Sequence, residues 1–171
     1  LPVTIQIDRL EAARVELGAA LAGAPVALRL RGGGRFTSLL RASLQLDAQR
    51  LDAVPATYRA QARLSAQQIL VQVDLDEGAG GPLANLARLP GLGALAVHLQ
   101  LSGPRNALAT LLDVSAGGLR AHASGTVDLP DRTAMLDLSL QSPAMSPRAG
   151  LSWQSVSLQA RARGSLTAPS T

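Results

Sequence analysis

Apolar and polar residues alternate along most of this chain. In the stretch VSLQARARGSL, residues 156–166, the apolar Val156 and Leu158 alternate with the polar Ser157 and Gln159. Successive side chains of a strand point to opposite sides, so a two-residue period gives one apolar and one polar face. The same alternation recurs at 3–7, 13–17, 26–32, 40–47, 57–65, 68–76, 95–102, 110–116, 119–129 and 134–140. The pattern therefore predicts about eleven strands.

One segment, GPLANLARLPGLG, has the spacing of a helix instead. Leu83, Leu86 and Leu89 lie three residues apart, Pro82 stands at a natural first-turn position, and a proline–glycine pair follows Leu89. We expect a short helix near 82–90, of about two turns. A single short helix cannot build repeated βαβ units, so the predicted sheet is mainly antiparallel.

The fold class that follows is all-β, with residues 1–171 forming a single β-rich segment. About eleven strands with three or four inward residues each give roughly forty apolar positions, which one short helix cannot cover. The sheet could fold on itself as a β-sandwich or filled barrel, or it could form a curved open sheet, a trough, whose apolar lining meets lipid chains. Aromatic content is only 2%, and a uniformly aliphatic lining favours the trough.

The apolar phases of these strands define a candidate lipid-groove lining. It consists of aliphatic side chains that share one phase within each predicted strand. The candidate lining residues are Ile5, Ile7, Leu28, Leu44, Leu46, Leu64, Ile69, Val71, Val73, Val97, Leu99, Leu101, Val127, Leu136, Leu138, Leu140, Val156 and Leu158.

Composition limits the other function classes. All sixteen basic residues are arginine, the formal net charge is +4, and there is no cysteine, which excludes disulfides and thiolate chemistry. The arginines are spread among Gln and Ser on polar faces and do not form a basic stripe, so we expect no nucleic-acid partner. The chain opens on Leu1 and Pro2 without a leader-like segment, and we expect an internal piece of a longer protein.

Two short motifs are better interpreted as structure than as chemistry. The stretch LRGGGRF (30–36) is similar to an RGG nucleic-acid segment, but it occurs once and with almost no aromatic residues, so we expect a hairpin turn. The stretch DLDEGAGG (74–81) lacks the alternate ligand spacing of a calcium loop, and we interpret it as the polar end of a strand followed by a turn.

No set of residues predicts an active site. His98 and His122 fall on polar strand faces without a third clustered ligand, so we expect surface histidines and no metal. There is no G-x-S-x-G elbow, and the absence of lysine excludes a Ser–Lys pair and a phosphate loop with its lysine. A glycan-active enzyme would need paired carboxylates and aromatic platforms. We therefore predict no catalytic residues, no cofactor and no enzyme activity.

Three stretches resemble the TamB family, the inner-membrane subunit of the translocation and assembly module. Residues 81–108 resemble its Leu-Pro-Gly-Leu segment followed by a strand and a Gly-Pro turn. Residues 118–140 resemble its unit of a glycine, a strand, a turn, an arginine and a strand. Residues 151–170 combine a tryptophan, an alternating strand and G-x-L-x-x-P. The chain is also similar to the wider AsmA-like group.

The resemblance implies a β-taco, an open trough that reaches across the periplasm from an inner-membrane anchor not present in this chain. It implies transport of phospholipids between inner and outer membrane, with acyl chains as the partner. It also implies support for the assembly and secretion of outer-membrane proteins such as autotransporters, with the barrel protein TamA bound through regions outside this fragment. A self-contained β-sandwich that serves as a binding or structural module of the envelope remains the alternative.

Overall fold

The computed structural model describes residues 4–19, 25–38, 40–52, 54–87 and 89–165, which form twelve strands, a short α-helix and a 3-10 turn. The first strands are β1 (Ile5–Leu17), β2 (Val26–Ser38), β3 (Arg41–Arg50), β4 (Ala56–Leu64) and β5 (Ile69–Glu77). The short elements α2 (Pro82–Leu86) and η1 (Pro90–Leu92) follow. The remaining strands are β6 (Leu95–Gly103), β7 (Leu108–Ala116), β8 (Leu119–Asp128), β9 (Thr133–Ser142), β10 (Met145–Arg148), β11 (Leu151–Trp153) and β12 (Val156–Ser165).

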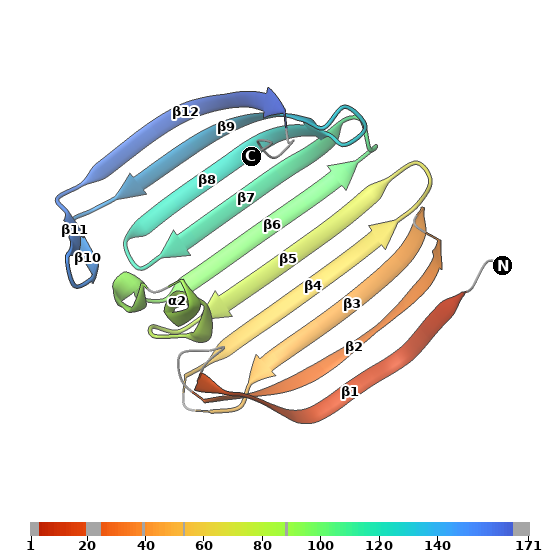
Figure 1. Cartoon of the computed structure of the whole chain (residues 1–171), viewed down its shortest axis with the longest axis horizontal. Helices are drawn as coiled ribbons and strands as arrows, with labels where there is room; N and C mark the ends of the chain where they lie inside the picture. The colour runs from red at the N-terminus through yellow and green to blue at the C-terminus, as the bar shows by residue number, and fades with distance from the viewer. Residues whose placement is uncertain (1–3, 20–24, 39, 53, 88, 166–171) are drawn as a thin grey trace, which may run out of the picture.

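Ten strands form one antiparallel sheet in which neighbours from β1 to β9 are consecutive along the chain (Figure 1). The order runs from β1 to β9 and then to β12, while β10 and β11 form a separate hairpin. The sheet is open, with β1 and β12 as its two edges, which confirms the predicted open antiparallel fold. The β-sandwich alternative is not adopted, because the only other sheet in the described part of the chain is that two-stranded hairpin.

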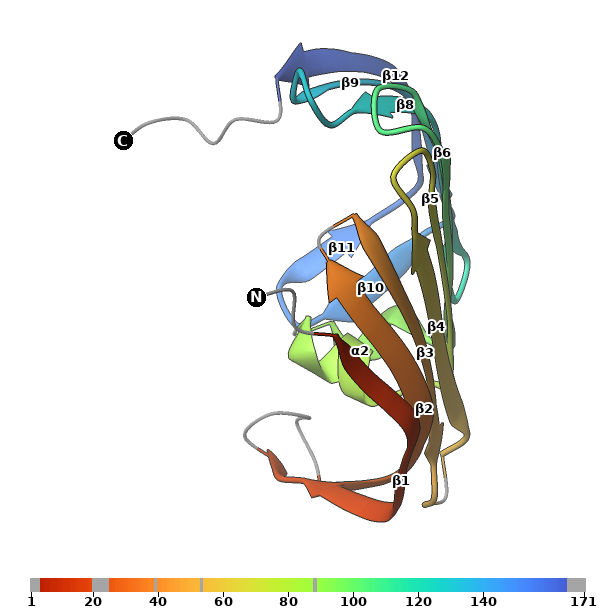
Figure 2. The same ribbon diagram turned by 90° about the vertical axis from the view of Figure 1, so that its right-hand side faces the viewer.

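The sheet curves, so that both of its edges bend toward the side on which α2, β10 and β11 lie (Figure 2). The register identifies this inner side as the apolar one. The backbone N–H of Leu83 in α2 donates to the carboxylate of Glu77 at 3.1 Å, so the Glu77 side chain points to the inner side. Val73 and Leu75 share its phase in β5 and therefore point the same way. We call the sheet face that carries this phase the concave face and the opposite one the convex face.

The first strand differs from the prediction. The stretches 3–7 and 13–17 belong to a single strand, β1, in which the pairing with β2 shifts between Ile7 and Leu10 and between Ala12 and Val15. Each shift is a bulge that adds a residue and moves the apolar phase from odd to even numbers or back. The sequence therefore loses its two-residue period where the strand continues. Val3 lies outside the described residues.

The predicted hairpin turn at 30–36 was wrong, because Gly32, Gly33 and Gly34 lie inside β2. A side chain at Gly32 would place its Cβ 2.6 Å from the carbonyl oxygen of Gln45. At Gly34 the Cβ would lie 2.7 Å from the carbonyl oxygen of Ser43. The glycines thus serve a close approach of β2 and β3 rather than a turn.

The predicted helix near 82–90 exists but is shorter, since α2 ends at Leu86 and a separate 3-10 turn follows. Pro82 occupies the first-turn position expected of it. The sequence gives no sign of β10 and β11, which have only four and three residues, because alternation over so few positions is not recognisable. Trp153 ends β11, outside the main sheet, and its indole Nε1 donates to Ser142 Oγ at 2.8 Å.

Candidate functional site

The register places all eighteen predicted lining residues on the concave face. A row of paired residues that crosses the whole sheet shows this most clearly, since directly paired residues point to the same side. The row consists of Ile7, Gly34, Leu44, Ala62, Val71, Leu101, Thr110, Gly125, Leu136 and Ala162. Every other predicted lining residue lies in the same phase of its strand as a member of this row.

Most of this apolar surface lacks a cover within the described chain. Among the eighteen residues only Ile69 is buried, at 7% exposure. Ile5, Leu44 and Leu158 keep 54%, 53% and 52% of their surface exposed. Ile7 and Val156 are also exposed, and the other twelve are half-buried, mainly against their neighbours in the sheet. An ordinary soluble domain would bury such a face against a second layer.

One end of the concave face is covered, and we call it the capped end. Here α2, η1 and the β10–β11 hairpin fold over the strand ends (Figures 1 and 2). Ala84 of α2 and Pro147 of β10 are almost completely buried, and Ala56 and Ala116 are buried at the adjoining strand ends. The opposite ends of the strands are joined by short connections, such as residues 104–107 and 129–132.

A polar cluster lies on the concave face at the capped end. The hydroxyl of Tyr58 donates to Glu77, which is 4% exposed and also accepts the N–H of Leu83. The Arg50 guanidinium contacts the Asp52 carboxylate. Burial raises the pKa of Tyr58 well above its ordinary value, and the hydrogen bond to Glu77 adds to the rise. The hydrogen bond from Arg50 lowers the pKa of Asp52.

The sequence analysis did not predict this polar cluster, although the sequence contains a sign of it. Glu77 continues the odd-numbered apolar phase of Val73 and Leu75, and a carboxylate in an apolar phase indicates a buried partner. The interpretation of residues 74–81 as the polar end of a strand and a turn agrees with β5 ending at Glu77. It overlooked that Glu77 points inward while Asp74 and Asp76 point outward.

The two histidines lie on the convex face, as predicted, but each has an aspartate partner on a neighbouring strand. His98 Nδ1 is 2.5 Å from Asp74 Oδ1, and His122 Nδ1 is 2.7 Å from Asp113 Oδ1. The contact with His98 lowers the pKa of Asp74. Sequence spacing could not find these pairs because the partners come from paired strands. Among residues 4–165, apart from the gaps given above, no three His, Cys, Asp or Glu side chains come together to hold a metal ion.

The concave face can therefore offer contact and solvation to apolar chains. Strands of nine or ten residues rise by 3.3–3.4 Å per residue, so the face is about 30 Å long in the strand direction. Over most of that length its side chains are Leu, Val, Ile and Ala, which form no hydrogen bonds. The polar groups are concentrated at the capped end.

None of the helices in the described part of the chain is both long and apolar enough to cross a membrane. Comparisons of the chain with protein-family models, with curated proteins and with solved structures gave no match.

Proposed function

We propose that this chain is a segment of a hydrophobic groove that conducts phospholipids between the inner and outer membranes of a bacterial envelope. The observation that carries the proposal is the exposed aliphatic concave face, which ten strands share and which α2, η1 and β10–β11 cover only at one end. The stretches that resemble the TamB family support the same conclusion from the sequence. No chemical step is part of the proposal.

The physical basis is the transfer of acyl chains between apolar surroundings. Each CH₂ group removed from water stabilises the bound state by about 0.8 kcal/mol. Contacts between CH₂ groups and aliphatic side chains have no directional requirement, so an acyl chain can slide without breaking specific bonds. Headgroups would stay in water at the open side of the curved sheet, because the concave face outside the capped end has few polar side chains to receive them.

By the same resemblance we place the chain in the periplasm, held to the inner membrane through a segment outside this sequence. Support for outer-membrane protein assembly, with the barrel protein TamA, would depend on regions outside it as well. A self-contained binding module is less well supported, because such a module would cover its apolar face with its own chain. Here Leu44 and Leu158 remain half exposed or more.

A charge placed on the concave face tests the proposal. Leu138 lies in the middle of β9 and pairs with Ala123 of β8 and Ala160 of β12. We expect Leu138→Arg to lower the transfer of a fluorescent phosphatidylethanolamine between vesicles by about tenfold or more, because an acyl chain would have to pass an unpaired guanidinium. The measurement is the rate of fluorescence dequenching in the presence of the purified chain.

The matched control is Gln141→Arg, which adds the same charge to an exposed residue of β9 in the opposite phase. Its transfer rate should equal that of the unaltered chain, and circular dichroism should show that both variants keep their strand content. Unchanged transfer by a folded Leu138→Arg variant would count against the groove.

A further inference from the structure

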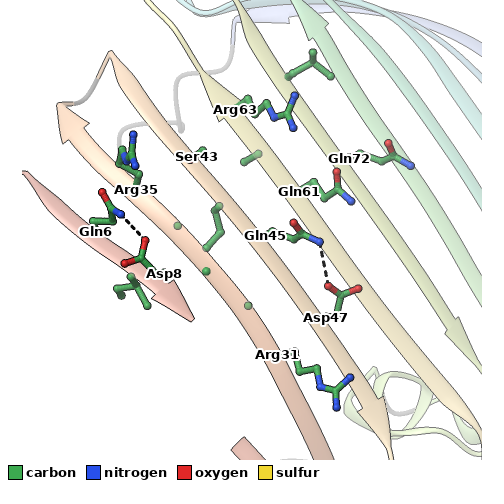
Figure 3. A pocket seen from close by; sticks show the side chains of 17 residues that line it. Gln6, Asp8, Arg31, Arg35, Ser43, Gln45, Asp47, Gln61, Arg63 and Gln72 are labelled. Atoms are coloured by element: carbon green, nitrogen blue, oxygen red, sulfur yellow. Dashed lines mark hydrogen bonds between the residues drawn. The ribbon is translucent and has the colours of Figure 1, made fainter. Parts of the chain in front are cut away.

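A hollow lies on the convex face, opposite to the proposed lipid groove. It has a volume of about 670 Å³ and is formed by strands β1 to β5 (Figure 3). Its lining is mostly polar, in contrast to the aliphatic concave face. The polar lining residues are Gln6, Asp8, Arg31, Arg35, Ser43, Gln45, Asp47, Gln61, Arg63 and Gln72.

Two arginines of this lining have no partner among the described residues. Arg35 on β2 and Arg63 on β4 both pair with Ser43 on the strand between them, so they lie in one row, two strands apart. Two steps between neighbouring strands place their backbones about 10 Å from each other. Arg31, the third arginine of the hollow, contacts Glu11 at 3.3 Å, and Glu11 also contacts Arg9. Arg35 and Arg63 thus place two guanidinium groups on either side of a hydroxyl group, in a lining that also holds the carboxylates of Asp8 and Asp47.

The next row of the hollow consists of three glutamines. Gln45, Gln61 and Gln72 are paired across β3, β4 and β5 and are exposed. The amides of Gln45 and Gln72 donate to Asp47 and Asp74, at 3.5 and 2.9 Å, and these bonds leave both amide oxygens free as acceptors.

A glycine at the end of the glutamine row leaves space beside it. Gly33 continues the row on β2 and has no side chain to fill the space beside Gln45. Figure 3 shows the three amides side by side below Arg63, with Arg35 on the other side of Ser43.

We propose that this hollow binds a hydroxyl-rich molecule that carries two phosphate groups, of the sugar-bisphosphate class. The planar guanidinium matches phosphate oxygens in a bidentate way, and two free guanidinium groups about 10 Å apart fit two separate phosphates better than one. The glutamine oxygens would accept hydrogen bonds from hydroxyl groups between the phosphates. The polar side chains that carry this proposal lie in the convex phase of their strands, although Ile7 and Leu44 of the concave phase also border the hollow. The proposal does not depend on lipid binding to the concave face.

Isothermal titration calorimetry with fructose 1,6-bisphosphate at about 0.15 M ionic strength, where the Debye length is about 8 Å, tests this proposal. We expect saturable binding with one site per chain and little or no binding of fructose. The double variant Arg35→Gln/Arg63→Gln should weaken binding at least about tenfold, because it removes both charge-assisted contacts. Both arginines are exposed, so the variant should fold, and circular dichroism verifies that it does.

The matched control removes the same charge outside the hollow. Arg29 and Arg41 are exposed, lie in the convex-face phase of β2 and β3, and do not line the hollow. The variant Arg29→Gln/Arg41→Gln should keep its affinity within about twofold, because neither guanidinium lines the hollow and exposed charges are screened at this ionic strength. Equal losses in the two double variants would overturn the proposal and indicate attraction by net charge alone.

The same chemistry occurs in free sugar phosphates and in phosphorylated lipid headgroups. A second titration uses phosphatidylcholine vesicles with and without phosphatidylinositol 4,5-bisphosphate. Binding to fructose 1,6-bisphosphate that exceeds binding to the vesicles supports a free ligand, and the reverse supports a headgroup. Binding to neither probe would overturn the site.

Discussion

At the scale of single residues, Glu77 determines how the capped end is held together. The N-cap position of α2, directly before Pro82, is Gly81, which has no side chain to cap the helix. Both carboxylate oxygens of Glu77 lie 3.1 Å from the N–H of Leu83 and supply that cap from β5. A Cβ at Gly81 would collide with the Glu77 carboxylate, so the glycine is required by this contact.

The hydroxyl of Tyr58 completes the cluster and makes it sensitive to alkali. Tyr58 is the only tyrosine of the chain, so its ionisation can be followed without interference from another phenol. Burial and the Glu77 carboxylate raise its pKa above the ordinary value of about 10, because both disfavour the phenolate. A raised pKa means that the stabilisation is fully present below about pH 10 and is lost as the pH rises through the folded-state value.

We therefore expect tyrosinate absorbance to appear at higher pH in the folded chain than in the chain unfolded by urea. The free energy of unfolding should fall above about pH 10 in the unaltered chain. Tyr58→Phe should remove this alkaline loss, while its stability at neutral pH falls by about 1 kcal/mol through the missing hydrogen bond. A folded-state titration that coincides with the unfolded one would contradict the described environment of Tyr58.

Gly125 is a second residue on which the sheet depends. Its φ is +157°, and a Cβ there would overlap the carbonyl oxygen of Met135 on the neighbouring strand β9. Gly125→Ala should therefore destabilise the chain by about 2 kcal/mol or more, measured by urea unfolding, because β8 and β9 would have to separate locally.

Gly164 provides the comparison for this substitution. It lies on the same face in the edge strand β12, and a Cβ there meets no atom within 4 Å. Gly164→Ala should leave the free energy of unfolding within about 0.5 kcal/mol of the original value. Equal losses from the two substitutions would mean that strand propensity, and not the contact with Met135, determines the effect.

At the scale of elements, the register is marked by a row of alternating acidic and basic residues across the convex face. Polar contacts join neighbouring strands along it, for example the ion pair of Asp47 with Arg59 at 3.7 Å and the contact of Asp74 Oδ1 with His98 Nδ1 at 2.5 Å. An exposed pair contributes only about 0–1 kcal/mol, but a slip by one residue would bring each strand's charges to the concave face. The row comprises Glu11, Arg31, Asp47, Arg59, Asp74, His98, Asp113 and His122.

The strands themselves were predictable because each carries a long alternating pattern. The phase of Leu136, Leu138 and Leu140 in β9 identifies their common face without any knowledge of neighbours. What could not be predicted depends on contacts between strands. The bulges of β1 erase the period locally, and the glycines of β2 look like a turn because the close approach to Gln45 and Ser43 is invisible in the sequence.

At the scale of the whole molecule, the sheet has no second layer over most of its apolar side. Its most buried residues, such as Ala84, Ala116 and Pro147, lie at the capped end. The middle of the sheet depends on ladder hydrogen bonds and on contacts between neighbouring side chains. An uncovered apolar face of this size is unfavourable in water. A contiguous exposed apolar surface of this kind favours binding or association.

The two edge strands of the sheet differ in how regular they are. β1 carries two bulges, which bend an edge strand away from further pairing. β12 pairs with β9 over ten residues without a bulge and contains no proline.

Composition and alternation predicted the open trough as one of two arrangements. The choice between them needed the curvature and the position of α2 and β10–β11, which follow from long-range packing.

The most direct test of the central claim is photo-crosslinking from both faces of the same strand. A photoreactive amino acid replaces Leu99 or Leu158 on the concave face, and in matched variants it replaces Gln100 or Gln159 on the convex face. Each variant is irradiated with vesicles of phosphatidylethanolamine and phosphatidylglycerol, and adducts are identified by mass spectrometry. We predict phospholipid adducts from positions 99 and 158 and few from 100 and 159. Equal labelling of the two faces, or crosslinks from the concave face to protein alone, would contradict a lipid-bearing trough.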